Sequence, residues 1–293
     1  MSPAVALRLG RVSNLPTVWT NALAGTALAG GQIWTLSTLL IAIGLSLLYV
    51  SGMYLNDAFD RDIDALERPS RPIPAGLVTA DSVFAAGFAL MLGGLAFVLG
   101  ASAATSASVS TAGRPMLTAL ALAGAILFYD WHHKGNVLSP LFMGFCRVLA
   151  YLTAGYAAAA APSSALFAGT LVSLCYLIGL TYIAKQEALD RIGSLWPLLF
   201  LGIPIIYGVA HAWNGTLMRV ALVVALVAWI LVALYLLKRR AKGDVPRAVV
   251  SLIAGIALLD ALFLAMTGAI AASILALFCF GLTVALQRWV SGT

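Results

Sequence analysis

The chain has 293 residues, of which 62% are hydrophobic and only 10% are charged. A soluble globular domain has about 25% charged residues, so this chain has too little charge to cover a water-facing surface. The composition excludes a soluble enzyme, and it excludes a disordered chain, which would be poor in apolar residues. In a membrane protein the net charge of +6 indicates cytoplasmic anchoring, with no role in nucleic-acid binding.

Ten apolar stretches are long enough to be membrane helices, because a bilayer core of about 30 Å needs about 20 helical residues. They predict an all-α fold, a polytopic transmembrane helix bundle that forms one domain over residues 1–293. Only Thr267 and Gly268 separate the last two stretches, so nine to ten helices are expected. The stretches are 14–31, 35–57, 80–102, 114–131, 137–160, 164–186, 195–213, 217–237, 246–267 and 269–289.

The basic residues favour ten helices with both termini in the cytoplasm. In that arrangement 14 of the 17 Lys and Arg residues lie in inner segments, Arg114 and Arg219 lie outside, and Arg147 lies within a span. Positive charge gathers on the cytoplasmic side of membrane proteins. We therefore expect a multi-pass protein of a bacterial inner membrane, in contact with membrane lipid, with its active-site loops in the cytoplasm.

The most specific motif is NDAFDRDID at residues 56–64, at the inner end of the second predicted helix. At about 100° per residue, a continuous helix places Asn56, Asp57, Asp60 and Asp64 on one arc and turns Asp62 to the far side. Carboxylates on one face repel one another unless a cation lies between them. Oxygen ligands favour Mg²⁺, which commonly shares its coordination shell with phosphate oxygens. The motif therefore predicts a site for Mg²⁺ and a diphosphate.

A long loop with three prolines, at about residues 58–80, brings basic residues after this motif. Arg68 and Arg71 are candidate diphosphate ligands, since a guanidinium group binds phosphate through two parallel hydrogen bonds. Two other interpretations are open. The acidic side chains could pair with Arg61 and Arg68 at a solvated helix end, and any single Arg could serve only as a topology anchor.

A second inner loop and the first span add candidate substrate-binding residues. Tyr129 and Lys134 lie at the predicted mouth of the bundle, where Lys134 can contact a diphosphate. Arg147 lies about 15 Å further along a helix, and an ionisable residue within the membrane is a functional-site hypothesis by default. Its alternative role is a structural partner for a buried acid such as Asp130. Asn21 needs a hydrogen-bond partner in lipid, and it could line the cavity or join helices.

A third inner loop, at residues 181–193, mixes acids and bases. Glu187 and Asp190 are three residues apart and share a helix face, as do Tyr182 and Lys185. This segment could bind a second metal, or it could be an ordinary ion-paired helix end. Asp260 is alone in the ninth span, where the sequence identifies no partner for it.

These segments resemble the UbiA superfamily of membrane prenyltransferases. Residues 56–64, followed by Arg71-Pro72 and Gly76, are similar to its first aspartate-rich motif. The loop from Tyr129 to Lys134 resembles the middle cytoplasmic loop, and residues 182–193 occupy the place of the second aspartate-rich motif. The likeness covers roughly residues 8 to 193. The opening RLGRVSNLPTVWTNALAG resembles the EboC-like branch of the superfamily.

The resemblance implies a helical bundle around a central cavity with cytoplasmic cap loops. It implies transfer of a prenyl group from a polyprenyl diphosphate donor to a small or lipidic acceptor that remains unidentified. The implied cofactor is Mg²⁺ on the acidic motif, and the implied diphosphate ligands are Lys134, Arg71 and Arg147. The side chains most directly involved in catalysis would be Asp60, Asp64 and Lys134.

The second motif departs from the family pattern, because Lys185 stands where an aspartate is common and only Glu187 and Asp190 keep acids. We hypothesise that Lys185 replaces part of the charge of a second metal. An altered acceptor or lost catalysis is also open, so a non-catalytic protein that binds polyprenyl lipid is one alternative. An ion-coupled transporter is another, although transporter sites lie near the bilayer midplane. The DGxxAR…GxxxDxxxD pattern of CDP-alcohol phosphotransferases is absent from the sequence.

Overall fold

The computed structural model describes residues 1–104, 109–133, 136–159, 161–187, 196–213, 215–290 and 292, with the side chains of all but 109–112 and 185–187. Every regular element in these ranges is helical, and two are short 3₁₀ helices, η1 (Val12–Asn14) and η2 (Trp196–Leu201). The α-helices are α1 (Pro3–Leu9), α2 (Leu15–Leu28), α3 (Leu36–Phe59), α4 (Arg61–Glu67), α5 (Ala80–Ala104), α6 (Val109–His132), α7 (Ser139–Ala158), α8 (Ser164–Glu187), α9 (Gly202–Ala212), α10 (Leu217–Arg239), α11 (Asp244–Met266) and α12 (Ile270–Leu286).

Each of the ten predicted spans coincides with a helix or a pair of helices, so the predicted all-α class is confirmed. Six helices of the described chain are long and apolar enough to cross a membrane, namely α3, α5, α7, α8, α10 and α11. Two other predicted spans are shorter, since α2 has 14 residues and α12 has 17. The predicted span at 195–213 is a composite, because the 3₁₀ turn η2 leads directly into α9.

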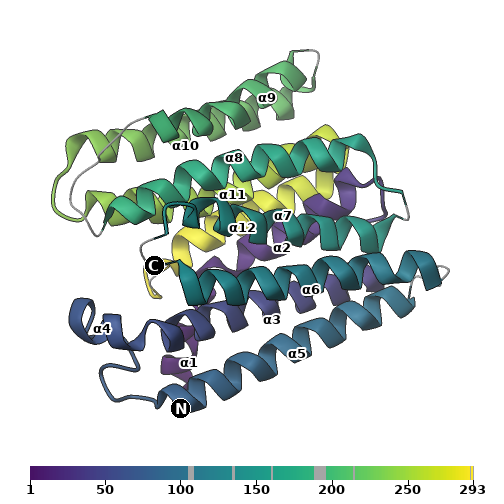
Figure 1. The fold of residues 1–293 in the computed structure, drawn as a ribbon. Helices are drawn as coiled ribbons and strands as arrows, with labels where there is room; N and C mark the ends of the chain where they lie inside the picture. Colours follow the sequence, from purple (N-terminus) through teal and green to yellow (C-terminus); the bar gives the residue numbers. More distant parts are fainter. Residues whose placement is uncertain are drawn as a thin grey trace.

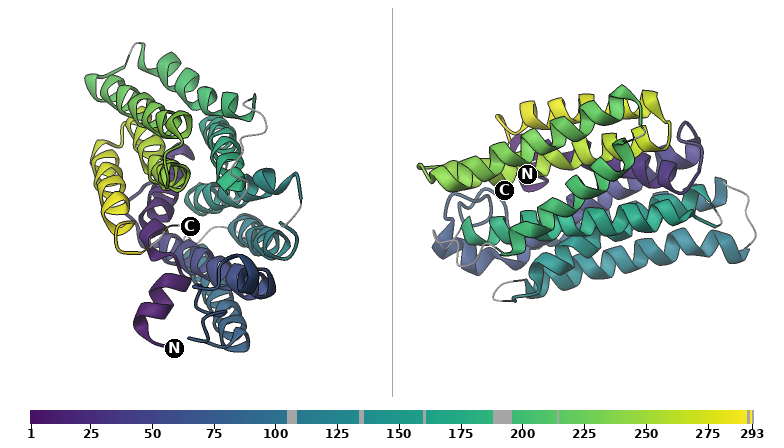
Figure 2. Two further views of the ribbon diagram at one scale, coloured as in Figure 1. Left: turned by 90° about the vertical axis from the view of Figure 1, so that its left-hand side faces the viewer. Right: turned by 90° about the horizontal axis from the view of Figure 1, so that it is seen from above.

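The helices run side by side along one common direction, as Figures 1 and 2 show. α3, α5 and α6 form one side of the bundle, and α8, α9 and α10 form the opposite side (Figure 1). Both ends of the chain lie at the end of the bundle that carries the short helix α4. This end therefore gathers the N-terminal segment, the acidic motif and the loop that follows it.

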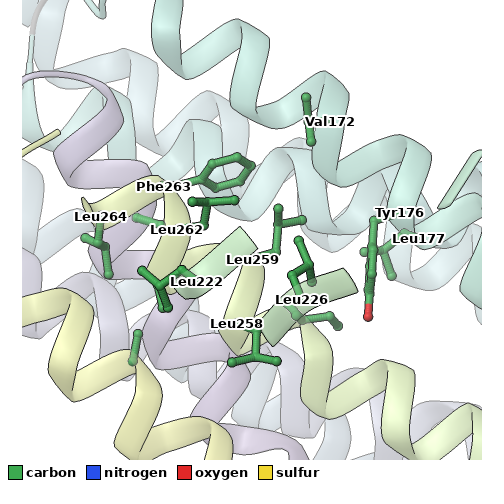
Figure 3. Close-up of a cluster of buried hydrophobic side chains, with 14 of the residues drawn as sticks. Val172, Tyr176, Leu177, Leu222, Leu226, Leu258, Leu259, Leu262, Phe263 and Leu264 are labelled. Atoms are coloured by element: carbon green, nitrogen blue, oxygen red, sulfur yellow. The ribbon is translucent and has the colours of Figure 1, made fainter. Parts of the chain in front are cut away.

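The largest apolar core lies where α8, α10 and α11 meet. Figure 3 shows Val172 and Tyr176 of α8 facing Leu222 and Leu226 of α10, with Phe263 of α11 among them. In its apolar 18-residue window α11 is 78% buried, whereas α10 is 33% buried. α11 is therefore an inner helix that its neighbours surround, and any polar side chain it carries must find partners inside the protein.

α3 and α5 approach each other closely through two glycines, Gly44 and Gly94. A Cβ atom added at Gly94 would lie 2.8 Å from the Gly44 carbonyl oxygen and 2.8 Å from Leu48 Cγ. Small residues allow such backbone approach between membrane helices, where van der Waals packing and not the hydrophobic effect drives association. The contact keeps the helix that carries the acidic motif fixed against α5.

We expect Gly94→Ala to lower the thermal unfolding midpoint in detergent, because the methyl group meets backbone that cannot move aside. Overpacking of this kind costs about 1–3 kcal/mol. Gly93→Ala is the matched control, since its Cβ would lie 3.6 Å from Leu47 Cδ1, an ordinary contact. Gly93→Ala should unfold at or above the wild-type temperature, because alanine favours the helix. Equal midpoints for the two variants would contradict the close contact.

Candidate active site

The acidic motif lies where α3 passes into α4 with almost no break. Asp60 joins the two helices with helical dihedrals, φ −80° and ψ −1°. The ladder of backbone bonds continues, since the Asp60 N–H donates to Asn56 O (2.9 Å) and the Asp64 N–H donates to Asp60 O (2.8 Å). The four predicted side chains are buried, whereas the side chain of Asp62 is 85% exposed. This burial follows the one-sided arrangement that the spacing predicts.

Two arginines neutralise the inner carboxylates of this motif. Arg71 Nη1 donates to Asp57 Oδ1 at 3.0 Å and to Asp64 Oδ2 at 2.6 Å, so one guanidinium bridges two aspartates. Arg11 Nη2, from the segment before η1, donates to Asp57 Oδ1 at 3.1 Å. Asp57 is 6% exposed and Asp64 is 1% exposed. Attraction at this burial is much less screened than at a surface.

The alternative pairing of the motif with Arg61 and Arg68 is wrong. Arg61 pairs with Asp62 at 3.7 Å on the solvent side, and Arg68 is exposed. Among the predicted basic ligands of this loop, only Arg71 therefore reaches the buried carboxylates. Sequence analysis does not identify Arg11 as a site residue, because it lies 46 residues from its partner Asp57.

α6 supplies a second set of contacts to the motif. Asn56 Nδ2 donates to Asp130 Oδ1 at 3.3 Å, and His133 Nε2 lies 3.4 Å from Asp60 Oδ2. The His133 ring stacks on Tyr129, with the ring centroids 4.8 Å apart. Asp130 therefore contacts the acidic motif and not Arg147. Tyr129, predicted at the mouth of the bundle, thus lies beside the His133 contact with Asp60.

A cavity lies between five helices, and Asp130, which accepts a hydrogen bond from Asn56 of the motif, is part of its wall. Its wall is mostly apolar, and its aromatic rings are those of Tyr49 and Tyr129. An acidic and a basic side chain line it as well, those of Asp130 and Arg147. The lining residues are Val18, Leu45, Tyr49, Gly52, Met53, Leu122, Ile126, Tyr129, Asp130, Met143, Cys146, Arg147, Ala150 and Leu177. Such a cavity suits a ligand with a long apolar part and a charged end.

The structure supplies the partners of Asp260 that the sequence does not identify. Its carboxylate accepts hydrogen bonds from Thr20, from Asn21 Nδ2 (2.7 Å) and from the Tyr151 hydroxyl. Arg147 Nη1 donates to Asn21 Oδ1 on the other side of the amide. Asn21 is fully buried and is not among the residues that line the cavity, so it joins helices here, and its contact with substrate stays a prediction.

Several predicted site residues cannot be compared with the structure. Lys134 and Asp190 lie outside the described residues, and the side chains of Lys185 and Glu187 are outside them as well. Tyr182 is half-buried on α8 and does not line the cavity. The second motif and the predicted lysine contacts therefore stay predictions.

Within the described ranges, two buried carboxylate oxygens have no hydrogen-bond partner, Asp64 Oδ1 and Asp130 Oδ2. Among the described residues no three His, Cys, Asp or Glu side chains converge closely enough to hold a metal ion. Instead, the Arg71 guanidinium lies between Asp57 and Asp64. The donor set of carboxylates and one amide nevertheless has the chemistry of a Mg²⁺ site. These two oxygens remain available as ligands of a cation.

Comparison with known proteins identifies the family. The model of the UbiA prenyltransferase family matches residues 17–247. The chain is 29% identical over 234 residues to digeranylgeranylglyceryl phosphate synthase of Methanopyrus kandleri, covering 78% of this chain and 77% of that enzyme. It is 36% identical over 121 residues to the chloroplastic chlorophyll synthase of Oryza sativa subsp. japonica, covering 39% of this chain and 30% of that enzyme.

Solved structures of UbiA homologues have a similar fold. A solved structure of a UbiA homologue from Archaeoglobus fulgidus, bound to GPP and Mg²⁺, superimposes with a TM-score of 0.61. The match covers 91% of this chain and 99% of that one at 16% identity, which shows a shared fold. With the family match over most of its length, the chain belongs to the UbiA prenyltransferase family and is a multi-pass membrane prenyltransferase.

Proposed function

We propose that this protein moves an allylic prenyl group from a prenyl diphosphate to an acceptor in a Mg²⁺-dependent reaction. The observation that carries the proposal is the position of the buried carboxylates. Asp57 lies at the end of α3, the helix that also forms one wall of the apolar cavity, and Arg71 bridges it to Asp64 on α4. A charged diphosphate and an apolar chain thus have adjoining places in one site.

The acidic motif and its arginines would bind the diphosphate in two different ways. Asn56, Asp57, Asp60 and Asp64 would hold Mg²⁺, which when bound supplies positive charge to the departing diphosphate. Arg11 and Arg71 would then bind diphosphate oxygens through their guanidinium groups. The resemblance to the family gives Lys134 the same role from the α6–α7 loop.

The cavity walls would guide the chemistry at the prenyl group. The bond between C1 of the prenyl chain and the diphosphate oxygen breaks, and the electron pair leaves with the diphosphate. The acceptor then forms a bond to C1 and loses a proton. The apolar walls exclude water, which would otherwise capture the allylic cation. Tyr49 and Tyr129 are the aromatic rings of this wall, and their faces can stabilise the cation.

For the acceptor we propose a glycerophosphate lipid. The support is that the relative matched over most of its length is named digeranylgeranylglyceryl phosphate synthase. The chlorophyll synthases match over shorter stretches and favour a chlorophyll-type acceptor as the second candidate. We also propose that the acidic end of the bundle faces the cytoplasm, as the distribution of basic residues predicts.

The test is Mg²⁺-dependent diphosphate release by the purified protein in detergent. Geranyl, farnesyl and geranylgeranyl diphosphate serve as donors, with and without a lipid extract of the host and with EDTA as the metal-free control. Release that needs Mg²⁺ and rises with the extract would support prenyl transfer. Tight Mg²⁺-dependent donor binding without release would instead favour a protein that binds polyprenyl lipid. If the protein showed neither donor binding nor diphosphate release, the result would favour the ion-coupled transporter.

A further inference from the structure

A buried polar network joins three helices deep in the bundle, beyond the acidic motif. Asp260 on α11 and Thr20, Asn21 and Tyr151 on α2 and α7 are all 0% exposed. A carboxylate in such surroundings is costly unless hydrogen bonds satisfy it. Three donors from two neighbouring helices do so here. The chain therefore keeps a charged group at this depth and builds a dedicated set of partners for it.

The network fixes the orientation of the Asn21 amide. Its Nδ2 group donates to Asp260 Oδ2 at 2.7 Å. An amide carries its donor and its acceptor on opposite sides, so Oδ1 must turn away from Asp260. That oxygen accepts a hydrogen bond from Arg147 Nη1. Asp260 thereby determines which side of the Asn21 amide faces Arg147, without a direct hydrogen bond or ion pair to the guanidinium.

Arg147 brings the network to the cavity wall. In the described part of the chain its recorded hydrogen bonds, to Asn21 Oδ1 and the Thr17 carbonyl, are both made by Nη1. The Nε–H and Nη2–H groups therefore remain for a ligand in the cavity that Arg147 lines. A guanidinium with one anchored nitrogen and free N–H groups is suited to a carboxylate or a phosphate.

We propose that Asp260 is a positioning residue, which through Asn21 holds the Arg147 guanidinium at the cavity wall to bind an oxyanion of the acceptor. The inference rests on the proposed prenyl transfer. The diphosphate end of the site already has Arg11 and Arg71 on its carboxylates. Arg147 is anchored to α2 instead, and in the described chain it has no hydrogen bond or ion pair with the acidic motif, so we assign it to the second substrate.

A double-mutant cycle tests the proposal. Wild type, Asp260→Asn, Arg147→Met and the double variant are assayed with labelled geranylgeranyl diphosphate, Mg²⁺ and graded amounts of host lipid extract. Each single variant should raise the half-saturating amount of extract about 10- to 100-fold, because small misplacements of a binding group have effects of that size. The double variant should match Arg147→Met alone, since residues in one network are not additive. Donor affinity should stay within about two-fold of wild type in every variant.

Two further variants distinguish an effect on the position of Arg147 from a general loss of stability. Asp244 is also 0% exposed on α11, but its carboxylate is held by Arg239 (2.7 and 2.8 Å) at the helix end. Asp244→Asn should therefore lower stability without changing the dependence on extract. If Asp260→Asn does not fold, Asn21→Ala removes the link to Arg147 while Thr20 and Tyr151 still bind Asp260, and the same cycle applies.

The outcomes are distinct. The proposal would be overturned if the double variant raised the half-saturating amount of extract by the product of the two single effects. An Asp260 or Asn21 variant that weakens donor binding as much as transfer would overturn it too. Wild-type behaviour of Arg147→Met would overturn it as well. Absence of transfer by the wild-type protein would count against the proposed prenyl transfer itself, so the two failures can be told apart.

Discussion

Replacing Asp60 and Asp64 together by alanine is expected to abolish Mg²⁺-dependent diphosphate release, with a loss of about 10³-fold or more. Both side chains are buried, with exposed fractions of 5% and 1%. They lie one helical turn apart on the face that also carries Asp57. Removing both leaves the proposed metal with too few carboxylates, and the charge of the departing diphosphate is then poorly neutralised. Release is measured with geranyl, farnesyl and geranylgeranyl diphosphate at saturating Mg²⁺.

Asp62→Asn is the matched control for this loss. Asp62 belongs to the same motif, yet its side chain is 85% exposed and its partner is the solvent-facing Arg61. An exposed pair of this kind contributes little, so release should stay within about two-fold of wild type. If Asp60→Ala/Asp64→Ala kept Mg²⁺-dependent release while Asp62→Asn lost it, the buried face would not be the metal site.

The helices and the acidic face could be predicted because both depend on local sequence. Apolar runs of about 20 residues mark membrane helices whatever they pack against. The helical period alone puts Asp60 and Asp64 on one side and Asp62 on the other. The structure bears out that division, with Asp64 1% exposed and Asp62 largely in solvent.

The contacts that complete the site could not be predicted, because they join segments far apart in the chain. Arg11 meets Asp57 across 46 residues, and Asn56 meets Asp130 across 74. Asp260 meets Thr20 across 240 residues. A periodic sequence pattern does not predict such contacts, because they depend on how the helices pack. A lone acid in an apolar helix did indicate that partners must exist, since lipid offers none.

The bridging position of Arg71 has a consequence for stability. One nitrogen, Nη1, donates to Asp57 Oδ1 at 3.0 Å and to Asp64 Oδ2 at 2.6 Å, while Asp64 Oδ1 has no hydrogen-bond partner among the described residues. Arg11 also binds Asp57, but in the described chain Asp64 has no second recorded cation. In the metal-free protein Arg71 is therefore the main counter-charge of Asp64.

Arg71→Met is expected to lower the unfolding midpoint markedly in EDTA and to regain much of that loss in Mg²⁺. Removing one partner of a buried ion pair costs about 3–5 kcal/mol, because the other charge is left uncompensated. A cation that binds the folded state restores stability by mass action, and it should do so more in the variant, where no guanidinium competes for the carboxylates. Thermal unfolding in detergent, with and without Mg²⁺, measures both effects. Arg68→Met, at an exposed position of the same loop, should match wild type in both buffers. An Arg71→Met midpoint that is unchanged in EDTA, or equally low with Mg²⁺, would contradict the idea that Arg71 and Mg²⁺ compensate the same carboxylates.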